Sequence, residues 1–514
     1  MPLSPFRLRV LVASLLVVSF LGALDHTIVS TSLATVAGEL NALEQMAWVV
    51  VGFTLAATVL LPVIGKLGDL VGPRRVFLVS LVVFIVASLG CGFAQDLPQL
   101  VIARVLQGMS SAGLQLMSHT IIAYVASPRD RPRLLSIIGA AFPVAIVVGP
   151  VLGGLITDFW GWPWVFWINV PVGLAALIFA VFAIPHIEPG ARQRFDVAGA
   201  VLFTVAMVAL VLGVTWIGDP AASLSALLAL GVAVLAFIAF FVVELGVAAP
   251  IVPLRAIRQR TIAVGVALSA IIGIGLFSVV AYLPTYFQMA FGTSATVSGL
   301  VPIATVFGML VSNLITGHLA SRTGRYRVYP IVGTTMGSLG LLAMALLPYG
   351  VPLWAPAVCM AIVGLGTGCF MSLVLAIVQS GVARNEIGAI TATTNLVRQV
   401  GATLGTAVIG SVIGFSVVAR LPRGLEASSL TPEIVHTAPV AVQQQVAAIY
   451  HDVLAPVFLV LAAVYAVGIV AALLLPAGTL SDRMDSERGP SSAPAMPTAR
   501  TDSPGTPITS KERS

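Results

Sequence analysis

Asp25 and Arg104 are ionisable residues inside stretches of sequence that are otherwise mostly apolar. Asp25 lies near the middle of segment 8–34, and Arg104 lies in segment 98–123. On insertion scales, an Asp or Arg at the centre of a membrane helix costs about 2.5–3.5 kcal/mol. An ionised carboxylate there takes up a proton, pairs with a cation or faces a wet cavity, and each outcome suits a protein that moves protons or solutes. The alternative is that Asp25 is only hydrogen-bonded to a nearby backbone group or hydroxyl.

The expected depths of Asp25 and Arg104 are close enough for their side chains to meet. The two segments run in opposite directions, and a rise of 1.5 Å per residue places Arg104 about 9 Å and Asp25 about 16 Å below the same membrane surface. We therefore expect direct or water-mediated coupling between them; the alternative is that Arg104 hydrogen-bonds only helix carbonyls. His26 points about 100° away from Asp25 on a helix, and it is a candidate proton relay.

The composition indicates that most of the chain lies in lipid. Of 514 residues, 58% are hydrophobic and 9% are charged, whereas soluble domains have about 25% charged residues. Apolar runs long enough to span a bilayer recur along the chain, without the short alternating segments of a membrane β-barrel. We predict an all-α integral membrane protein with 14 transmembrane helices. The spacing of Cys91, Cys359 and Cys369 matches neither a metal site nor a disulfide framework.

Lys and Arg gather in alternate loops, which indicates the orientation of the chain. Arg7 and Arg9 precede the first predicted helix, and the loops on that side carry Lys66, Arg74, Arg75, Arg129, Arg131, Arg133, Arg192, Arg194, Arg255, Arg258, Arg260, Arg322, Arg325, Arg327 and Arg384. The opposite side has only Arg420 and Arg423, so the positive-inside rule places both termini in the cytoplasm. The net charge of +6 reflects these loops and is not a nucleic-acid signal.

Two segments outside the predicted helices differ from the short loops. The tail 477–514 is rich in Ser, Pro and Thr, so we expect it to be disordered. The loop 420–451 is the one long external segment, and its stretch 440–449 is expected to form a short helix at the membrane surface.

Two similar loop motifs lie about 250 residues apart in the chain. The first reads GKLGDLVGPRR over residues 65–75, and a weaker copy over residues 317–325 has Ser321 where Asp69 stands. Glycine allows helix ends to approach closely, and Asp69 is placed to cap a helix start or to pair with an Arg. Such duplication is typical of transporters.

These motifs resemble those of the major facilitator superfamily. Segment 65–75 is similar to its cytoplasmic-loop motif, RVLQG at 104–108 to its Arg-x-x-Gln-Gly motif, and GPVLGG at 149–154 to the Gly-Pro motif of its proton-driven exporters. The 14-span drug/proton antiporters of that superfamily have motifs that resemble LDHTIV at 24–29, WVFWINVPVG at 164–173, FDVAG at 195–199 and YLPTYFQ at 282–288. The resemblance covers about residues 10–475.

The resemblance implies a fold and a set of gating residues. It implies two six-helix bundles with pseudo-two-fold symmetry, at residues 1–190 and 261–476, with two inserted helices and linkers at 191–260 and a tail at 477–514. The residues it assigns to gating are Gly65, Asp69, Gly72, Arg74 and Arg75 in the loop motif and Gly149, Pro150, Gly153 and Gly154 in segment 134–157. It also implies a location in the inner membrane of a bacterial cell.

A central cavity would need polar groups to contact substrate. The candidates are Gln107, Gln115, Gln288, Asn313 and Arg398, each of which is also suited to bonding helices together. No Asp or Glu lies deep in the predicted helices after residue 261, in contrast to family members with several acidic groups there. This departure argues against divalent organic cations as substrates, because one carboxylate cannot neutralise two charges.

The leading functional prediction is a proton-coupled antiporter that exports amphiphilic or cationic small molecules by alternating access, as in multidrug efflux and antibiotic resistance. Its partners would be substrates, protons and the lipid bilayer, with no cofactor and no metal, because the proton gradient supplies the drive; the oligomeric state is not predicted. The first alternative is a dedicated exporter of one natural product, lipid or peptide. A membrane enzyme or sensor is a remote alternative, because the sequence has neither a nucleophile–base or metal constellation nor a phosphate-binding loop for ATP.

Overall fold

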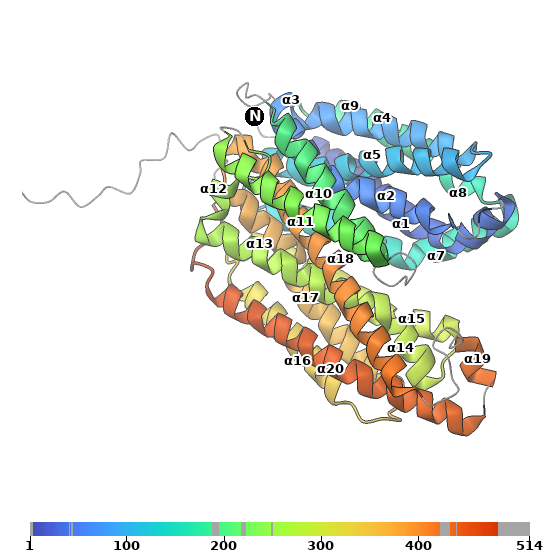
Figure 1. The fold of residues 1–514 in the computed structure, drawn as a ribbon. Helices are drawn as coiled ribbons and strands as arrows, with labels where there is room; N and C mark the ends of the chain where they lie inside the picture. The colour runs from blue at the N-terminus through green and yellow to red at the C-terminus, as the bar shows by residue number, and fades with distance from the viewer. Residues whose placement is uncertain are drawn as a thin grey trace, which may run out of the picture.

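The computed structural model describes residues 4–40, 42, 45–187, 195–216, 223–247, 250–421, 432–437 and 439–481. These residues are almost wholly helical, as Figure 1 shows. Thirteen helices are long and apolar enough to cross a membrane, or 14 if one bent pair counts as a single span. The prediction of an all-α membrane fold with 14 spans is confirmed on that count.

The first group of helices contains the amino-terminal third of the chain. Its members are α1 (Pro5–Glu39), α2 (Ala47–Val59), α3 (Leu61–Val71), α4 (Pro73–Gly92), α5 (Leu97–Val125), α6 (Arg131–Gly139), α7 (Ala141–Trp160), α8 (Pro163–Trp167) and α9 (Asn169–Ala183). Helix α1 packs against α7 and α9, and α5 packs against α2 and α4. Apolar side chains such as Leu11, Leu15, Phe77 and Phe84 are fully buried in this group.

Prolines explain where two of these spans break. The axes of α2 and α3 differ by 45° at Leu60, two residues before Pro62. A shorter interruption at Ala140, within a stretch that still counts as one span, separates α6 from α7 three residues before Pro143. Proline removes one backbone donor and its ring clashes with the carbonyl four residues earlier. Helix α3 is therefore a separate piece that carries the start of the loop motif.

Helices α10 (Val197–Trp216) and α11 (Ser223–Gly246) pack against each other as the predicted insert. Helix α10 also contacts α2 of the first group and α18 of the second, so the pair lies across the junction of the two groups (Figure 1). Their remaining faces expose apolar side chains such as Leu224, Leu235 and Leu245. Arg192 and Arg194, which were expected in the preceding loop, lie outside the described residues.

The second group of helices occupies the other layer of Figure 1. It consists of α12 (Leu254–Ile257), α13 (Arg260–Ile272), the π-helix η3 (Gly273–Phe277), α14 (Ser278–Phe291), α15 (Ala295–Thr323), α16 (Val328–Leu346), α17 (Trp354–Ser380), the 3-10 helix η4 (Arg384–Glu386), α18 (Ile387–Arg420), α19 (Pro432–Thr437) and α20 (Val440–Leu473). The largest apolar core belongs to this group and surrounds Tyr286, Phe287, Phe370 and Tyr465.

Two expectations about the segments around α20 are settled differently. The stretch 440–449 is not a separate surface helix, because it forms the first turns of α20, which continues without a break to Leu473. In the predicted tail, Leu480 donates its N–H to the carbonyl of Gly324 at 2.9 Å, so the start of the tail is attached to the second group. Residues 482–514 and Arg423 lie outside the described part of the chain. The domain boundaries at residues 190, 260 and 476 stay a prediction.

Candidate functional site

The carboxylate of Asp25 binds three side chains inside the first group of helices. Arg104 of α5 donates from Nη1 to Asp25 Oδ2 at 2.5 Å. Gln107 Nε2 and Asn169 Nδ2 both donate to Oδ1, at 2.7 and 2.9 Å. The expected direct coupling of Asp25 and Arg104 is thus present, and the carboxylate has the donors that an ionised form needs when it is buried.

This cluster is closed off from its surroundings. Asp25 is fully buried and Arg104 is 1% exposed. The guanidinium carbon of Arg104 lies 4.2 Å from the centre of the Phe53 ring and 5.7 Å from that of Phe166. The aromatic rings cover the cation and keep water from it, which strengthens the ion pair by lowering the local dielectric.

Two polar members of the cluster were not predicted from the sequence. Asn169 begins α9, and Ser88 of α4 accepts a hydrogen bond from Gln107 at 2.9 Å. Gln107 itself was expected in the cavity but is fully buried beside Asp25 instead, because Arg104 and Gln107 lie one helical turn apart on the same face of α5. An Asn in the otherwise apolar WVFWINVPVG segment was the available signal for a bonding partner.

Helix α7 packs directly against the turn of α1 that follows Asp25. Thr27 donates to the carbonyl of Ala145 at 3.0 Å. A side chain at Gly149 would overlap the side chain of Thr27, and one at Gly153 would overlap Ile28 and Thr31. These glycines therefore let α7 approach the Asp25 region closely, whereas a Cβ at Gly154 would meet open space.

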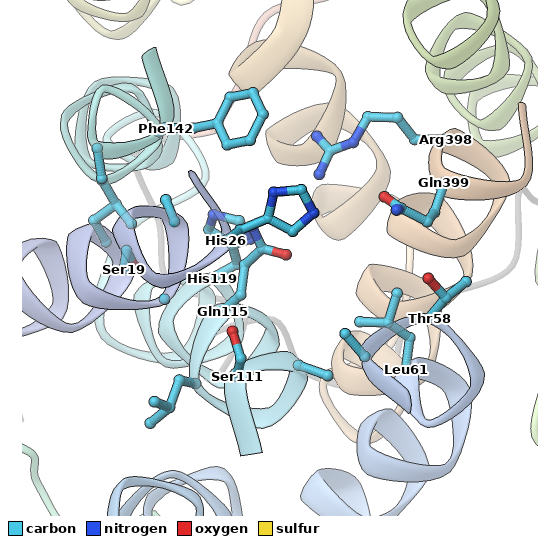
Figure 2. A pocket seen from close by; sticks show the side chains of 18 of the residues that line it. Ser19, His26, Thr58, Leu61, Ser111, Gln115, His119, Phe142, Arg398 and Gln399 are labelled. Carbon is cyan, nitrogen blue, oxygen red and sulfur yellow. The ribbon is translucent and has the colours of Figure 1, made fainter. Parts of the chain in front are cut away.

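A cavity of about 170 Å³ lies between the two groups of helices, and its lining combines apolar side chains with a few polar ones. Figure 2 shows His26, Gln115, His119, Arg398 and Gln399 around it. The predicted Gln115 and Arg398 line it, and so does His26, which faces the cavity and lies 3.5 Å from the Thr54 hydroxyl rather than bonding to Asp25. His119 of α5 also lines it.

Two other predicted cavity residues bond helices or neighbouring turns and do not line this cavity. Gln288 donates to the hydroxyl of Ser298 at 3.0 Å. Asn313 of α15 is buried and donates to the carbonyl of Ser136 in α6 at 3.0 Å. Both therefore fit the alternative that was left open for them, bonding between polypeptide segments.

The loop motif joins α3 of the first group to α18 of the second. Asp69 accepts hydrogen bonds of 2.8 Å from the backbone N–H groups of Gly388 and Ala389, in the first turn of α18. A carboxylate at this position satisfies amides that have no partner within the helix and complements the helix dipole. A Cβ at Gly388 would lie 2.6 Å from the carbonyl oxygen of Gly65, so the two helices touch through glycine. Asp69 is therefore the predicted helix cap, and α18 is its partner.

The remaining gating residues of the loop motif have distinct surroundings. Gly72 has a φ of 100°, which favours glycine, and it ends α3 and begins α4. Arg74 donates to the carbonyl of Val181 at 2.8 Å, near the end of α9. Arg75 is exposed. Pro150 is a half-buried residue inside α7.

The second copy of the motif makes an equivalent crossing between α15 and α6. A side chain at Gly317 would overlap Ser136 of α6. Ser321 donates to Asp130, the residue before α6, at 3.4 Å. Arg129 donates to the last carbonyls of α15, those of Ser321 and Arg322, at 2.9 and 2.8 Å. The contact of α3 with α18 thus has a counterpart in the contact of α15 with α6, which is consistent with pseudo-two-fold symmetry.

Hydrogen bonds between the two groups are concentrated on the side of the molecule that carries the amino terminus. Tyr124 donates to the carbonyl of Arg384 at 2.7 Å, and Arg384 donates to the carbonyl of Tyr124 at 3.1 Å. Arg131 is buried and donates to the carbonyl of Gln379 at 3.3 Å. Among the described residues, these bonds and those of both loop motifs hold that side closed.

The comparisons with known proteins agree with this architecture. Residues 15–406 match the family model described as the Major Facilitator Superfamily. An uncharacterized MFS-type transporter of Mycobacterium tuberculosis is 34% identical over 493 residues, which are 94% of this chain and 72% of that protein. The multidrug transporter protein MdtP of Bacillus subtilis is 30% identical over 405 residues, 78% of this chain and 75% of that one. The structure of the proton:xylose symporter XylE has a TM-score of 0.59 and 14% identity, over 92% of this chain and 97% of that one, which shows a shared fold.

Proposed function

The chain belongs to the major facilitator superfamily, whose members are multi-pass membrane transporters and not enzymes, and we propose that it is a proton-coupled antiporter that exports amphiphilic small molecules. The observation that carries this proposal is the buried Asp25–Arg104 pair. A charge pair with no exposure to solvent is costly to maintain and is a poor way to stabilise a fold. Its position in a transporter therefore favours a role in coupling.

Protonation of Asp25 would provide the switch. In the structure the carboxylate has three donors, one of which is the cationic Arg104, so it has the surroundings of the ionised state. A proton would neutralise Asp25 and leave Arg104 buried without a counter-charge, and breaking a buried pair in this way costs about 3–5 kcal/mol. That is enough to change the preferred packing of α1, α5 and α9.

The packing of α1 against α7 offers a route from the proton site to the junction of the two groups. Thr27 and Ile28 follow Asp25 by less than one turn and lie against Gly149 and Gly153 of α7. Helix α7 in turn contacts α15 of the second group. A shift of α1 on protonation would therefore move a helix that borders the cavity and the opposite group.

We further propose that the closed side is the cytoplasmic side of a bacterial inner membrane. Lys and Arg are concentrated there, in agreement with the positive-inside rule. On this assignment the structure represents an outward-facing state, and both termini are cytoplasmic. Access from the cytoplasm would require the bonds of Asp69 to α18 and of Arg129 to α15 to open.

Antiport is tested in proteoliposomes with the purified full chain and a pH-sensitive dye trapped inside. Addition of a transported amphiphile is expected to drive proton movement in the opposite direction, in proportion to the substrate flux. Substrate flux without proton movement would refute coupling. A panel of unrelated amphiphiles then separates the two forms of the proposal: uptake of many compounds favours multidrug export, and uptake of one favours the dedicated exporter.

A further inference from the structure

We propose that the central cavity is a binding site for amphiphiles with an anionic head group, which pairs with Arg398. This inference rests on the proposed transport function and names the substrate class of the same cavity. It narrows the expected substrates to acids, and it disfavours the organic cations that the sequence alone left open.

Arg398 is held in place by its own helix and by η3. A side chain at Gly273 of η3 would overlap the carbonyl of Arg398, and one at Gly401 would lie 2.9 Å from the carbonyl of Ala270. Helix α18 thus runs in direct contact with η3. A π-helix such as η3 is a local widening of an α-helix, and such widenings are often found at functional sites. This packing fixes the position from which the Arg398 side chain extends.

The guanidinium of Arg398 points into the cavity, toward His26, as Figure 2 shows. One of its amino groups, Nη2, donates to Asn395 Oδ1 at 2.7 Å. Among the described residues, no other acceptor binds it and no carboxylate lies within salt-bridge distance. Arg104, by contrast, has Asp25 as its counter-ion, so the two intramembrane arginines have opposite electrostatic surroundings.

The neighbours of Arg398 add further donors and no negative charge. His119 is 9% exposed, and its buried Nδ1 has no hydrogen-bond partner among the described residues. The amides of Gln115 and Gln399 also line the cavity. No Asp or Glu is among the described lining residues. The polar lining therefore contains hydrogen-bond donors beside the Arg398 charge and, among the described residues, no negative charge.

A cation without a counter-ion inside a membrane protein is unfavourable, and a bound anion removes that penalty. A carboxylate or phosphate head group would form charge-assisted hydrogen bonds with the planar guanidinium. An organic cation would meet the like charge of Arg398 with no carboxylate to offset it. The rest of the lining is mostly apolar and includes Phe142 and Phe277, whose ring centres lie 6.0 Å apart, so it suits the tail of an amphiphile.

The test uses three fluorescent probes with the same tail, binding to the purified full chain in nanodiscs at fixed pH without a gradient. The probes are dansylated undecanoic acid, its methyl ester, and the analogue with a trimethylammonium end. The acid is expected to bind about tenfold or more tightly than the ester, because a charged hydrogen bond is added, and the trimethylammonium probe is expected to bind most weakly. Equal binding of acid and ester, or preference for the cation, would overturn the proposal.

Variants separate Arg398 from general effects. Arg398→Gln is expected to lose the preference for the acid while it still binds the ester, which shows that the variant is folded. Arg398→Lys should keep part of the preference, and Arg9→Gln, an exposed arginine on α1, should leave it unchanged. An unchanged preference in Arg398→Gln would contradict the assignment.

An inorganic anion is the competing occupant of the same donors. Replacement of chloride by gluconate at constant ionic strength is expected to leave the acid-over-ester preference intact. If the acid binds no more tightly than the ester in either salt, and chloride itself is found to bind in the cavity, the site holds a free anion. The head-group proposal is then wrong. The binding experiment applies no gradient, so a negative result in it does not bear on antiport. Likewise, a negative result in the antiport experiment does not change how the binding data are interpreted.

Discussion

The carboxylate of Asp69, in the first group of helices, accepts a 2.8 Å hydrogen bond from the backbone N–H of Gly388, in the second group. The backbone N–H of the next residue, Ala389, donates to the same carboxylate. Asp69 therefore caps the amino terminus of α18, a helix that is distant from it in the sequence. Separation of the two groups on this side would remove that cap. The contact therefore favours the closed arrangement by the amount that a helix cap contributes.

Asp69→Ala is expected to favour opening of the side that carries the amino terminus. Loss of a cap is worth about 1–2 kcal/mol, which shifts a two-state ratio roughly 5- to 30-fold. The measurement is labelling of a cysteine at Ser111, in the cavity, by a membrane-impermeant thiol reagent added to inverted vesicles, with Cys91, Cys359 and Cys369 replaced by alanine. Labelling is expected to be faster in Asp69→Ala than in the parent protein. The rate for Asp69→Asn, whose side chain can still cap the helix, should lie between those two. Labelling no faster than in the parent would show that the cap does not control closure.

Gly149 and Gly154 form a matched pair for the packing of α7. Gly149→Ala places a methyl group against Thr27, and overpacking of this kind costs about 1–3 kcal/mol. Gly154→Ala adds the same group where nothing lies within 4 Å. Thermal unfolding in detergent is expected to occur at lower temperature for the first variant only, with reduced transport. Equal behaviour of the two variants would mean that the close approach of α7 to α1 is not needed.

Phe53 separates the buried ion pair from the cavity. Its ring lies 4.2 Å from the guanidinium carbon of Arg104 and also lines the cavity. Phe53→Ala is expected to admit water to Asp25 and to allow protons to leak without substrate. The measurement is the collapse of a pH gradient in substrate-free proteoliposomes, with Phe53→Leu as the control that retains an apolar wall. A Phe53→Ala variant that does not leak protons would contradict this role.

Asn169 supplies one of the three donors to the Asp25 carboxylate. Asn169→Leu is expected to reduce gradient-driven transport about 10- to 150-fold, since a hydrogen bond to a charged group contributes about 1.5–3 kcal/mol. Ser88→Ala is the control, because that hydroxyl contacts Gln107 and Asn169 but not the carboxylate. Initial rates of dye uptake in inverted vesicles measure both. Greater loss in the serine variant would place the essential contact elsewhere.

The sequence predicted the ion pair because an Asp and an Arg inside apolar helices have few ways to be satisfied. It did not predict the contacts of Asn169 or Ser88, because a neutral polar residue in a membrane helix can hydrogen-bond to many different groups, and the sequence does not show which one. The same ambiguity explains Gln288 and Asn313: helical periodicity does not say which face of a helix meets the cavity. The cap of Asp69 was predicted, but its partner α18 lies more than 300 residues further along the chain, and only the fold joins them.

The inserted helices illustrate a different limit. Their apolar composition predicted two spans, and the structure has α10 and α11 at those positions. Their place at the junction, in contact with α2 and α18, depends on tertiary packing that the composition does not encode.

The most direct test of proton coupling compares wild type with Asp25→Asn in inverted membrane vesicles. Uptake of the probe transported by wild type is followed while a pH gradient is imposed and then collapsed. Asn has nearly the same shape but cannot gain or lose a proton, so the variant is expected to bind the probe and to show no gradient-driven uptake. Full transport by Asp25→Asn, with unchanged dependence on the gradient, would show that Asp25 does not carry the coupling.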